Sequence, residues 1–175
     1  MVDREMTFRD ARVNDAADLA DIGRDTFIET FGHLYPPADL KRFVEETYSI
    51  DAMTTDLMDP QVEVRIAFAG RRIAAYCKIG PCKLPLDIGP EPALQLHRVY
   101  VYQVRQGVGA GRILLTWAIE RARQRGAKNL YLGVWQSNER AIALYESRGF
   151  ETLGSYKFHV GETVDDEYLM RLKLD

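Results

Sequence analysis

The stretch from Leu94 to Gln124 constrains the fold more than any other part of the chain. We interpret it as an apolar strand, a glycine-rich turn and a long amphipathic helix over 109–126. Gly107, Gly109 and Gly111 alternate through the turn, and glycine permits backbone angles and close ligand approach that side chains exclude. The first amides of the helix lack intrahelical partners and point at the same place. This arrangement suits an anion such as a phosphate.

Two familiar phosphate-binding motifs do not fit this turn. A dinucleotide-binding turn, Gly-x-Gly-x-x-Gly, would need glycine in place of Arg112 or Leu114. It would also need an acidic residue at the end of the next strand, which ends near Trp135 and Gln136. A P-loop needs Gly-Lys-Ser or Gly-Lys-Thr, and the chain contains neither. The turn is therefore either another kind of phosphate loop or a purely structural connection.

Composition narrows the class of protein. A length of 175 residues predicts a single domain, residues 1–175, with 46% hydrophobic and 28% charged residues. The formal net charge of −3 argues against a nucleic-acid partner, which would favour a basic surface. No run of 18 apolar residues occurs, so we expect no membrane span.

The N-terminal segment and the cysteines indicate the compartment. The start, MVDREMTFRD, lacks the basic and apolar regions of a signal peptide. Cys77 and Cys82 do not make a disulfide framework, and no Cys/His cluster has zinc spacing, so we expect no metal. We predict a cytoplasmic protein with reduced thiols.

The remaining pattern predicts a mixed α+β chain with a partly antiparallel sheet. Apolar periodicity and turn residues indicate strands at 7–13, 62–69, 72–79, 94–101, 129–136, 150–158 and 167–174, with an acidic turn at 161–166, and helices at 17–31, 37–48, 109–126 and 138–148. Two segments are candidates for shaping a site beside the central strand. One is the proline-rich loop over 80–92, and the other is the pair of N-terminal helices, which carries His33, Tyr35, Glu29, Glu45 and Glu46. Those carboxylates form either a solvated surface or an amine-binding wall.

A second constellation lies in the helix over 138–148. Asn138, Ala141 and Tyr145 stand at i, i+3 and i+7 and therefore share one face of the helix. The alanine leaves room beside that face, and the phenol lies two turns along. The plainer interpretation is a tyrosine at the edge of the core.

Together, these two segments resemble the GNAT N-acetyltransferase superfamily. The turn Gln106-Gly107-Val108-Gly109-Ala110-Gly111 is similar to its acetyl-CoA pyrophosphate loop, and NERAIALYESRGF matches its second motif. The resemblance implies a GNAT-like acyl-CoA N-acyltransferase fold, with a twisted, mostly antiparallel sheet of about seven strands flanked by about four helices. It also implies acetyl-CoA as co-substrate, with binding residues at Val99, Tyr100, Val101, Arg105, Gln106, Gly107, Val108, Gly109, Ala110, Gly111, Arg112, Asn138, Ala141 and Tyr145.

The implied reaction is direct acetyl transfer to a primary amine. An alkyl amine is almost fully protonated at pH 7, so a base must remove a proton before attack. His97 on the central strand is our first candidate for this base, with a glutamate or a water chain behind it. Tyr145 is the candidate acid for the departing thiolate. Neither cysteine has a neighbouring histidine in the sequence to activate it for an acyl-enzyme route.

A narrower resemblance concerns the acceptor. The segments TFIETF, LHRVYV, VWQSNERAIALYESRGF and FHVGETVDDEYLM look like those of PaiA-type polyamine acetyltransferases. This implies a small-molecule amine such as a polyamine as partner, and a homodimer is an expectation from the family. The alternatives are acetylation of a protein N-terminus or lysine, and a regulatory domain that binds coenzyme A without catalysis.

Overall fold

The computed structural model describes residues 5–175, and seven strands and five α-helices follow one another along this part of the chain. Their order is β1 (Met6–Asp10), α1 (Ala16–Phe31), α2 (Pro37–Thr47), α3 (Ile50–Met58), β2 (Glu63–Ala69), β3 (Arg72–Gly80), β4 (Ala93–Val101), α4 (Ala110–Gln124), β5 (Asn129–Trp135), α5 (Glu139–Glu146), β6 (Glu151–Val160) and β7 (Thr163–Lys173).

The strands form one sheet in the order β1-β2-β3-β4-β5-β7-β6. Every neighbouring pair is antiparallel except β4 and β5, which run parallel and are joined by the long connection through α4. A parallel pair needs such a crossover, whereas the antiparallel pairs β2–β3 and β6–β7 are joined by two-residue turns. The predicted mixed α+β class with a mostly antiparallel sheet is confirmed.

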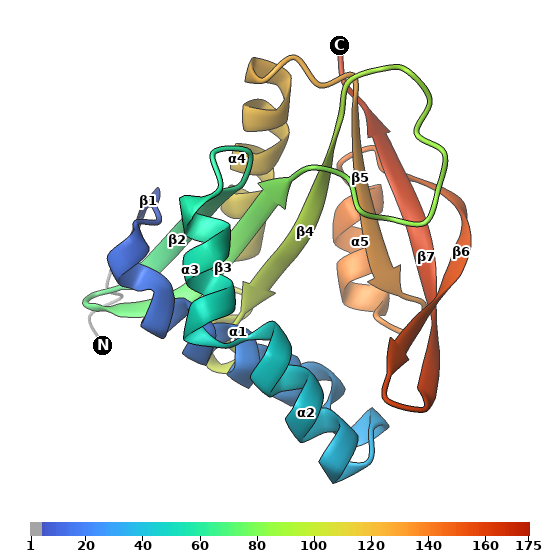
Figure 1. The fold of residues 1–175 in the computed structure, drawn as a ribbon. Coiled ribbons are helices and arrows are strands. Elements are labelled where there is room, and N and C mark those ends of the chain that lie inside the picture. The colour runs from blue at the N-terminus through green and yellow to red at the C-terminus, as the bar shows by residue number, and fades with distance from the viewer. Residues whose placement is uncertain (1–4) are drawn as a thin grey trace.

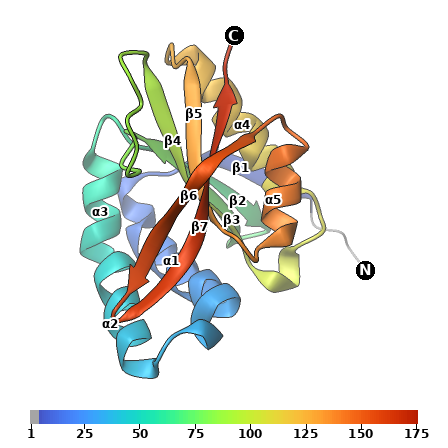
Figure 2. The same ribbon diagram turned by 90° about the vertical axis from the view of Figure 1, so that its right-hand side faces the viewer.

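Helices cover both faces of the sheet (Figures 1 and 2). Residues on alternate strand positions divide between two cores, because successive side chains point to opposite faces. On β3, Cys77 and Ile79 face the core under α4 and α5, and Tyr76 faces the core under α1, α2 and α3. The apolar face of α4, with Leu114, Leu115 and Ala118 fully buried, fixes that helix on its side of the sheet.

The sheet opens between its two central strands. The parallel pairing of β4 with β5 covers only Ala93–Gln95 against Asn129–Tyr131. Beyond that point the two strands diverge, as Figure 1 shows. The divergence begins next to a β-bulge: Leu96 pairs with Ile79 and Arg98 with Lys78, so His97 is the extra residue on β4. The bulge bends β4 away from β5 and leaves one edge of each strand open.

Two segments near the N-terminus differ from the prediction. The first strand ends at Asp10 instead of Val13, because Val13–Asp15 form a 3-10 turn that leads into α1. The helix α3 was missed altogether. Its N-cap is Ser49, whose hydroxyl accepts a hydrogen bond from the Ala52 amide at 3.1 Å.

The last hairpin also differs from the prediction. The acidic stretch expected as a turn over 161–166 is mostly strand, and only Gly161 and Glu162 lie between β6 and β7. Gly161 has a φ of 58°, which allows this two-residue connection. Side-chain contacts keep the acidic residues in the strand: Lys157 on β6 pairs with Asp166, and Tyr35 donates a hydrogen bond to Asp165.

Within residues 5–175, none of the helices combines the length and apolarity that crossing a bilayer requires. The prediction that the chain starts without a signal peptide concerns a segment whose first four residues lie outside the described residues.

Gly161 provides a test of this fold. A β-carbon there would overlap the Asp39 carboxylate at the start of α2, whereas Gly89, also at positive φ, has open space around it. We expect Gly89→Ala to lower the free energy of unfolding by about 1–2 kcal/mol through backbone strain alone. Gly161→Ala should cost a further amount of about 1–3 kcal/mol because of the overlap. Urea unfolding measures both, and equal losses, or no recovery in an Asp39→Ala background, would contradict the packing described.

Candidate active site

A single large cavity of about 1460 Å³ runs through the opening between β4 and β5. One end lies at the glycine-rich turn before α4, and the other lies between the N-terminal helices and the strands β5, β6 and β7. The cavity therefore connects the predicted phosphate loop with the predicted amine side of the molecule.

The glycine-rich turn forms an open cradle of backbone amides. Gly107 and Gly109 have φ of 88° and 86°, and a β-carbon added at either would meet no atom within 4 Å. Among the described residues, none of the amides of 107–112 donates a backbone hydrogen bond, and the first such bond of α4 runs from the Ile113 amide to the Gly109 carbonyl at 3.1 Å. Free amides at the start of a helix suit a pyrophosphate. The turn thus fits the coenzyme that its sequence implies.

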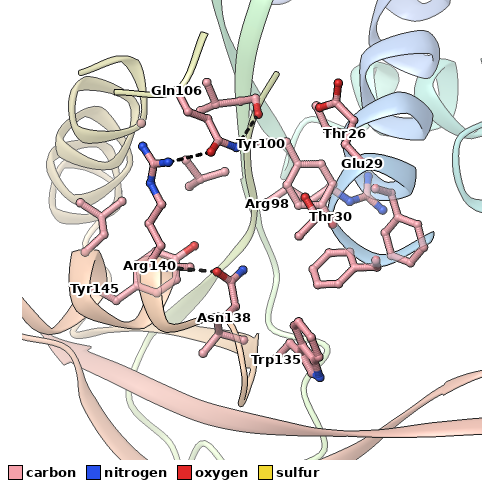
Figure 3. A pocket seen from close by; sticks show the side chains of 18 of the residues that line it. Thr26, Glu29, Thr30, Arg98, Tyr100, Gln106, Trp135, Asn138, Arg140 and Tyr145 are labelled. Atoms are coloured by element: carbon pink, nitrogen blue, oxygen red, sulfur yellow. Dashed lines mark hydrogen bonds between the residues drawn. The ribbon is translucent and has the colours of Figure 1, made fainter. Parts of the chain in front are cut away.

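Charged and polar side chains surround this cradle. Arg105 and Arg112 are exposed at its two ends. Gln106 donates a hydrogen bond to the Val101 carbonyl at 3.2 Å and accepts one from Arg140 at 2.8 Å, so it fastens the turn to both β4 and α5 (Figure 3). Arg140 was not predicted as a site residue. Only its place on the motif helix, between Asn138 and Ala141, could have drawn attention to it.

The open edge of β4 provides backbone groups beside the cradle. The Tyr102 amide bonds to the Ala74 carbonyl on β3. Since hydrogen-bonded residues alternate along an antiparallel pair, the backbone groups of Val99 and Val101 point away from β3, into the opening. The backbone of Tyr100 points toward β3, and this residue lines the cavity through its side chain. Two of the three predicted strand positions therefore turn backbone groups into the opening, where the Val101 carbonyl already accepts the hydrogen bond from Gln106.

The motif helix α5 brings Asn138, Ala141 and Tyr145 to the cavity as predicted from their spacing. Asn138 caps the helix, because its side-chain oxygen accepts a hydrogen bond from the Ala141 amide at 3.3 Å. Tyr145 is only 8% exposed and packs against Phe150, with the phenol directed into the cavity (Figure 3). Burial raises the pKa of Tyr145 above its ordinary value, with a further contribution from Cys77, so the phenol keeps its proton.

His97 lines the cavity at the bulge of β4. Its Nε2 lies 3.0 Å from the Pro81 carbonyl, which can only accept a hydrogen bond, so the neutral ring carries its proton on Nε2 and leaves Nδ1 as acceptor. Burial lowers the pKa of His97 to about 4, with the positive charge of Lys78 adding to the effect. The imidazole is therefore neutral at pH 7 and is a weak base.

The opposite wall of the cavity is aromatic and acidic, and the sequence analysis identified only part of it. Helix α1 contributes Phe31, which packs edge-on against Trp135 of β5 at 5.9 Å between ring centroids. Phe43 of α2 packs in the same way against Phe158 of β6 at 5.8 Å. Tyr35 donates to Asp165, Tyr156 donates to Glu167, and Glu29 also lines the cavity. Such a surface suits an organic cation, by charge and by cation–π contact.

The predicted amine-binding candidates divide between this wall and the solvent. Glu29, His33 and Tyr35 line the cavity, whereas Glu45 pairs with Lys41 on the exposed side of α2. Glu46 is exposed and does not line the cavity. No residue of the loop over 81–92 lines the cavity either, although Pro81 and Lys83 bond to β4 side chains. The N-terminal helices, not that loop, therefore line this end of the cavity.

A half-buried arginine, Arg98, also lines the cavity. The Arg98 guanidinium stacks on the Tyr48 ring at 4.8 Å, and Tyr48 and Tyr100 hydroxyls lie 3.3 Å apart. Sequence analysis named only Tyr100 of this cluster, because Tyr48, which brings Arg98 and Tyr100 together, comes from a distant part of the chain. Within the described residues, no group of three or more His, Cys, Asp or Glu side chains has the arrangement of a metal site.

Known proteins share both the sequence and the architecture. Residues 21–150 match the Acetyltransferase (GNAT) family. An uncharacterized N-acetyltransferase of Lactobacillus delbrueckii subsp. lactis is 28% identical over 160 residues, covering 91% of this chain and 92% of that protein.

Two solved structures with a coenzyme have the same fold. The PaiA N-acetyltransferase of Thermoplasma acidophilum in complex with coenzyme A superposes with a TM-score of 0.79 at 18% identity, covering 97% of this chain and 99% of that one. YncA of Salmonella typhimurium, a putative acetyltransferase with its cofactor acetyl-CoA, gives a TM-score of 0.68 at 23% identity, covering 97% and 94%. The chain belongs to the acetyltransferase (GNAT) family and is an N-acetyltransferase that uses acetyl-CoA.

Proposed function

We propose that this protein transfers the acetyl group of acetyl-CoA directly to a small primary amine, and that the amine is a polyamine. The observation that carries the proposal is the continuity of one cavity from the free amides of 107–112 to the aromatic, acidic wall. The cradle suits the coenzyme's pyrophosphate, and the wall suits a flexible cation. The PaiA-type resemblance of the sequence supports the same class of acceptor.

On the donor side, the backbone does most of the binding. The amides of 107–112, with Arg105 and Arg112 at the ends, hold the pyrophosphate, while Asn138 and Ala141 line the channel on the α5 side. The backbone groups of Val99 and the Val101 amide, which point into the opening, bond to the amides of the pantetheine arm as a neighbouring strand would. Acetyl-CoA supplies the acetyl thioester, and the protein supplies orientation and proton transfer.

On the acceptor side, the amine must lose a proton. An alkyl amine with a pKa of about 10.4 is neutral in only about one molecule in 2,500 at pH 7. His97 contacts the acceptor as a neutral imidazole whose Nδ1 is free to take this proton. With its low pKa, the ring holds the proton only transiently.

Tyr145 completes the reaction by protonating the departing sulfur. A thiol has an ordinary pKa of about 8.5, well below that of a phenol raised by burial. A phenol of this kind stays protonated until a thiolate forms beside it, and it stabilises that charge by a hydrogen bond.

An acceptor panel tests the proposal. Release of free thiol from acetyl-CoA should be fastest with spermidine or spermine, slower with short monoamines, and slowest with peptides that carry a free N-terminus or lysine. The aromatic, acidic wall is the physical reason, because it gains little from an acceptor with one charge. Peptides as the best acceptors would redirect the function to protein acetylation.

Filling the glycine-rich turn with a charged side chain should abolish the binding of coenzyme A. Gly109→Glu should remove measurable binding of coenzyme A, since it places bulk and negative charge where the pyrophosphate lies. Gly126→Glu is the matched control: Gly126 also has positive φ, open surroundings and a place next to α4, at the other end of the helix. Isothermal titration with coenzyme A should show normal affinity for the control. Retained affinity in Gly109→Glu would overturn the assignment of the cradle.

Removing the Tyr145 hydroxyl should lower kcat and leave the affinity for acetyl-CoA nearly unchanged. Tyr145→Phe keeps the ring contact with Phe150 and removes only the hydroxyl, so the fold should be preserved. We expect kcat to fall by about 100-fold or more, as for removal of a general acid, with the Kd for acetyl-CoA nearly unchanged. An unchanged kcat would remove Tyr145 from the mechanism.

A further inference from the structure

Glu167 is a carboxylate in the cavity whose role neither the motifs nor the fold explains. It lies on β7 opposite Trp135 of β5 and Tyr156 of β6, on the sheet face that α1 and α2 cover. It lines the cavity, and within the described residues it takes part in no ion pair with Lys or Arg. A largely buried carboxylate without a cationic partner needs a reason.

The fold makes room for this carboxylate by omitting a side chain. Position 133 on β5 is glycine, and a β-carbon there would lie 2.9 Å from the Glu167 carboxylate and would overlap the Tyr156 hydroxyl. Gly133 itself lines the cavity on the open part of β5, beyond the last residue that pairs with β4. The Tyr156–Glu167 pair therefore reaches into the opening where a β5 side chain would otherwise stand.

The β4–β5 register, extended by two residues past its last pair, brings this pair to the level of His97. Ala93 pairs with Asn129 and Gln95 with Tyr131, and continuing that offset sets Gly133 opposite the bulge of β4. His97 and Glu167 both line the cavity, one on each side of the opening. An amine that approaches the open edge of β4 from the acidic wall lies between them.

We propose that Glu167, held in place by Tyr156, is the group that finally receives the proton from the acceptor amine. This inference rests on the proposed function and names a base for it. Burial acts in opposite directions on the two candidates. It raises the pKa of Glu167 and lowers the pKa of His97 to about 4, so the carboxylate is the stronger base of the two.

Other groups around Glu167 set its protonation. The hydrogen bond from Tyr156 lowers its pKa, and the neighbouring charge of Asp165 raises it, while Tyr35 is engaged with Asp165. Burial is the largest of these effects and raises the pKa of Glu167, so this carboxylate accepts a proton more readily than an exposed one.

The protons balance as follows. The ammonium gives one proton to Glu167, by way of His97 or water, and the freed nitrogen pair forms the new C–N bond. The C–S bond breaks, the sulfur takes a proton from Tyr145, and the nitrogen's second proton restores the phenol. Glu167 then releases its proton to solvent, so one proton is released for each ammonium acetylated.

The test compares Glu167→Gln with Glu162→Gln, an exposed glutamate in the turn of the same hairpin. We expect kcat with the best amine to fall by about 100-fold to 10,000-fold for Glu167→Gln, with unchanged Kd for acetyl-CoA and no effect of the control. A loss below threefold overturns the inference. The inference is also overturned if His97→Gln loses about 100-fold to 10,000-fold in kcat while Glu167→Gln does not, because the imidazole would then be the group that keeps the proton.

Tyr156→Phe provides a readout that a merely structural role would not change. The substitution removes the hydrogen bond that the Tyr156 hydroxyl donates to the Glu167 carboxylate, and this should raise the pKa of Glu167. The acidic limb of the kcat/KM profile should therefore move to higher pH by about one unit. An unshifted limb overturns the inference, even where Glu167→Gln fails to fold.

One measurement separates this inference from the proposed function. If the wild-type protein acetylates none of the amines, the proposed function fails. Glu167 is then judged by carbon-13 NMR titration of labelled glutamate, with Glu162→Gln and Glu167→Gln for assignment. A Glu167 carboxyl that titrates above an ordinary glutamate supports its role as the proton acceptor, and one that titrates at or below it overturns that role.

Discussion

The separation of β4 from β5 is the constraint on which the site depends. Only three residue pairs join these strands before the bulge at His97 turns β4 away. Backbone amides and carbonyls that a continuous sheet would have paired are left facing a cavity, where a ligand with amide groups can satisfy them. The glycine-rich turn and the aromatic, acidic wall lie at the two ends of this opening, and they share one cavity only because the strands diverge.

Features that a short run of consecutive residues encodes could be predicted from the sequence. The cradle at 107–111 and the helix that carries Tyr145 are each encoded within a dozen consecutive residues, by glycine placement and by helical spacing. Both were predicted nearly to the residue. The fold class followed from the order of periodic segments.

Features that arise from pairing between distant segments could not be predicted. The wall joins Phe31 to Trp135 and Phe43 to Phe158, contacts that exist only after the sheet has formed. Asp165 was taken for part of a turn, although the hydroxyl of Tyr35, 130 residues earlier in the chain, holds it in a strand. The helix α3 was missed because its two threonines and its short length give a weak helical signal.

The short ladder between Leu94 and Leu130 also has a mechanical consequence. It is the only strand pairing that joins the half-sheet β1 to β4 with the half-sheet β5 to β7 in the described part of the chain. Side chains also hold the halves together, in the core under α4, where Leu114, Leu130 and Leu132 pack, and in the aromatic contacts of Phe31 with Trp135 and Phe43 with Phe158. The aperture between the halves thus depends in part on the apolar side chains under α4, which do not line the cavity. Changes in those side chains would tune catalysis by altering a hinge angle, without any change in the chemistry of the groups that react.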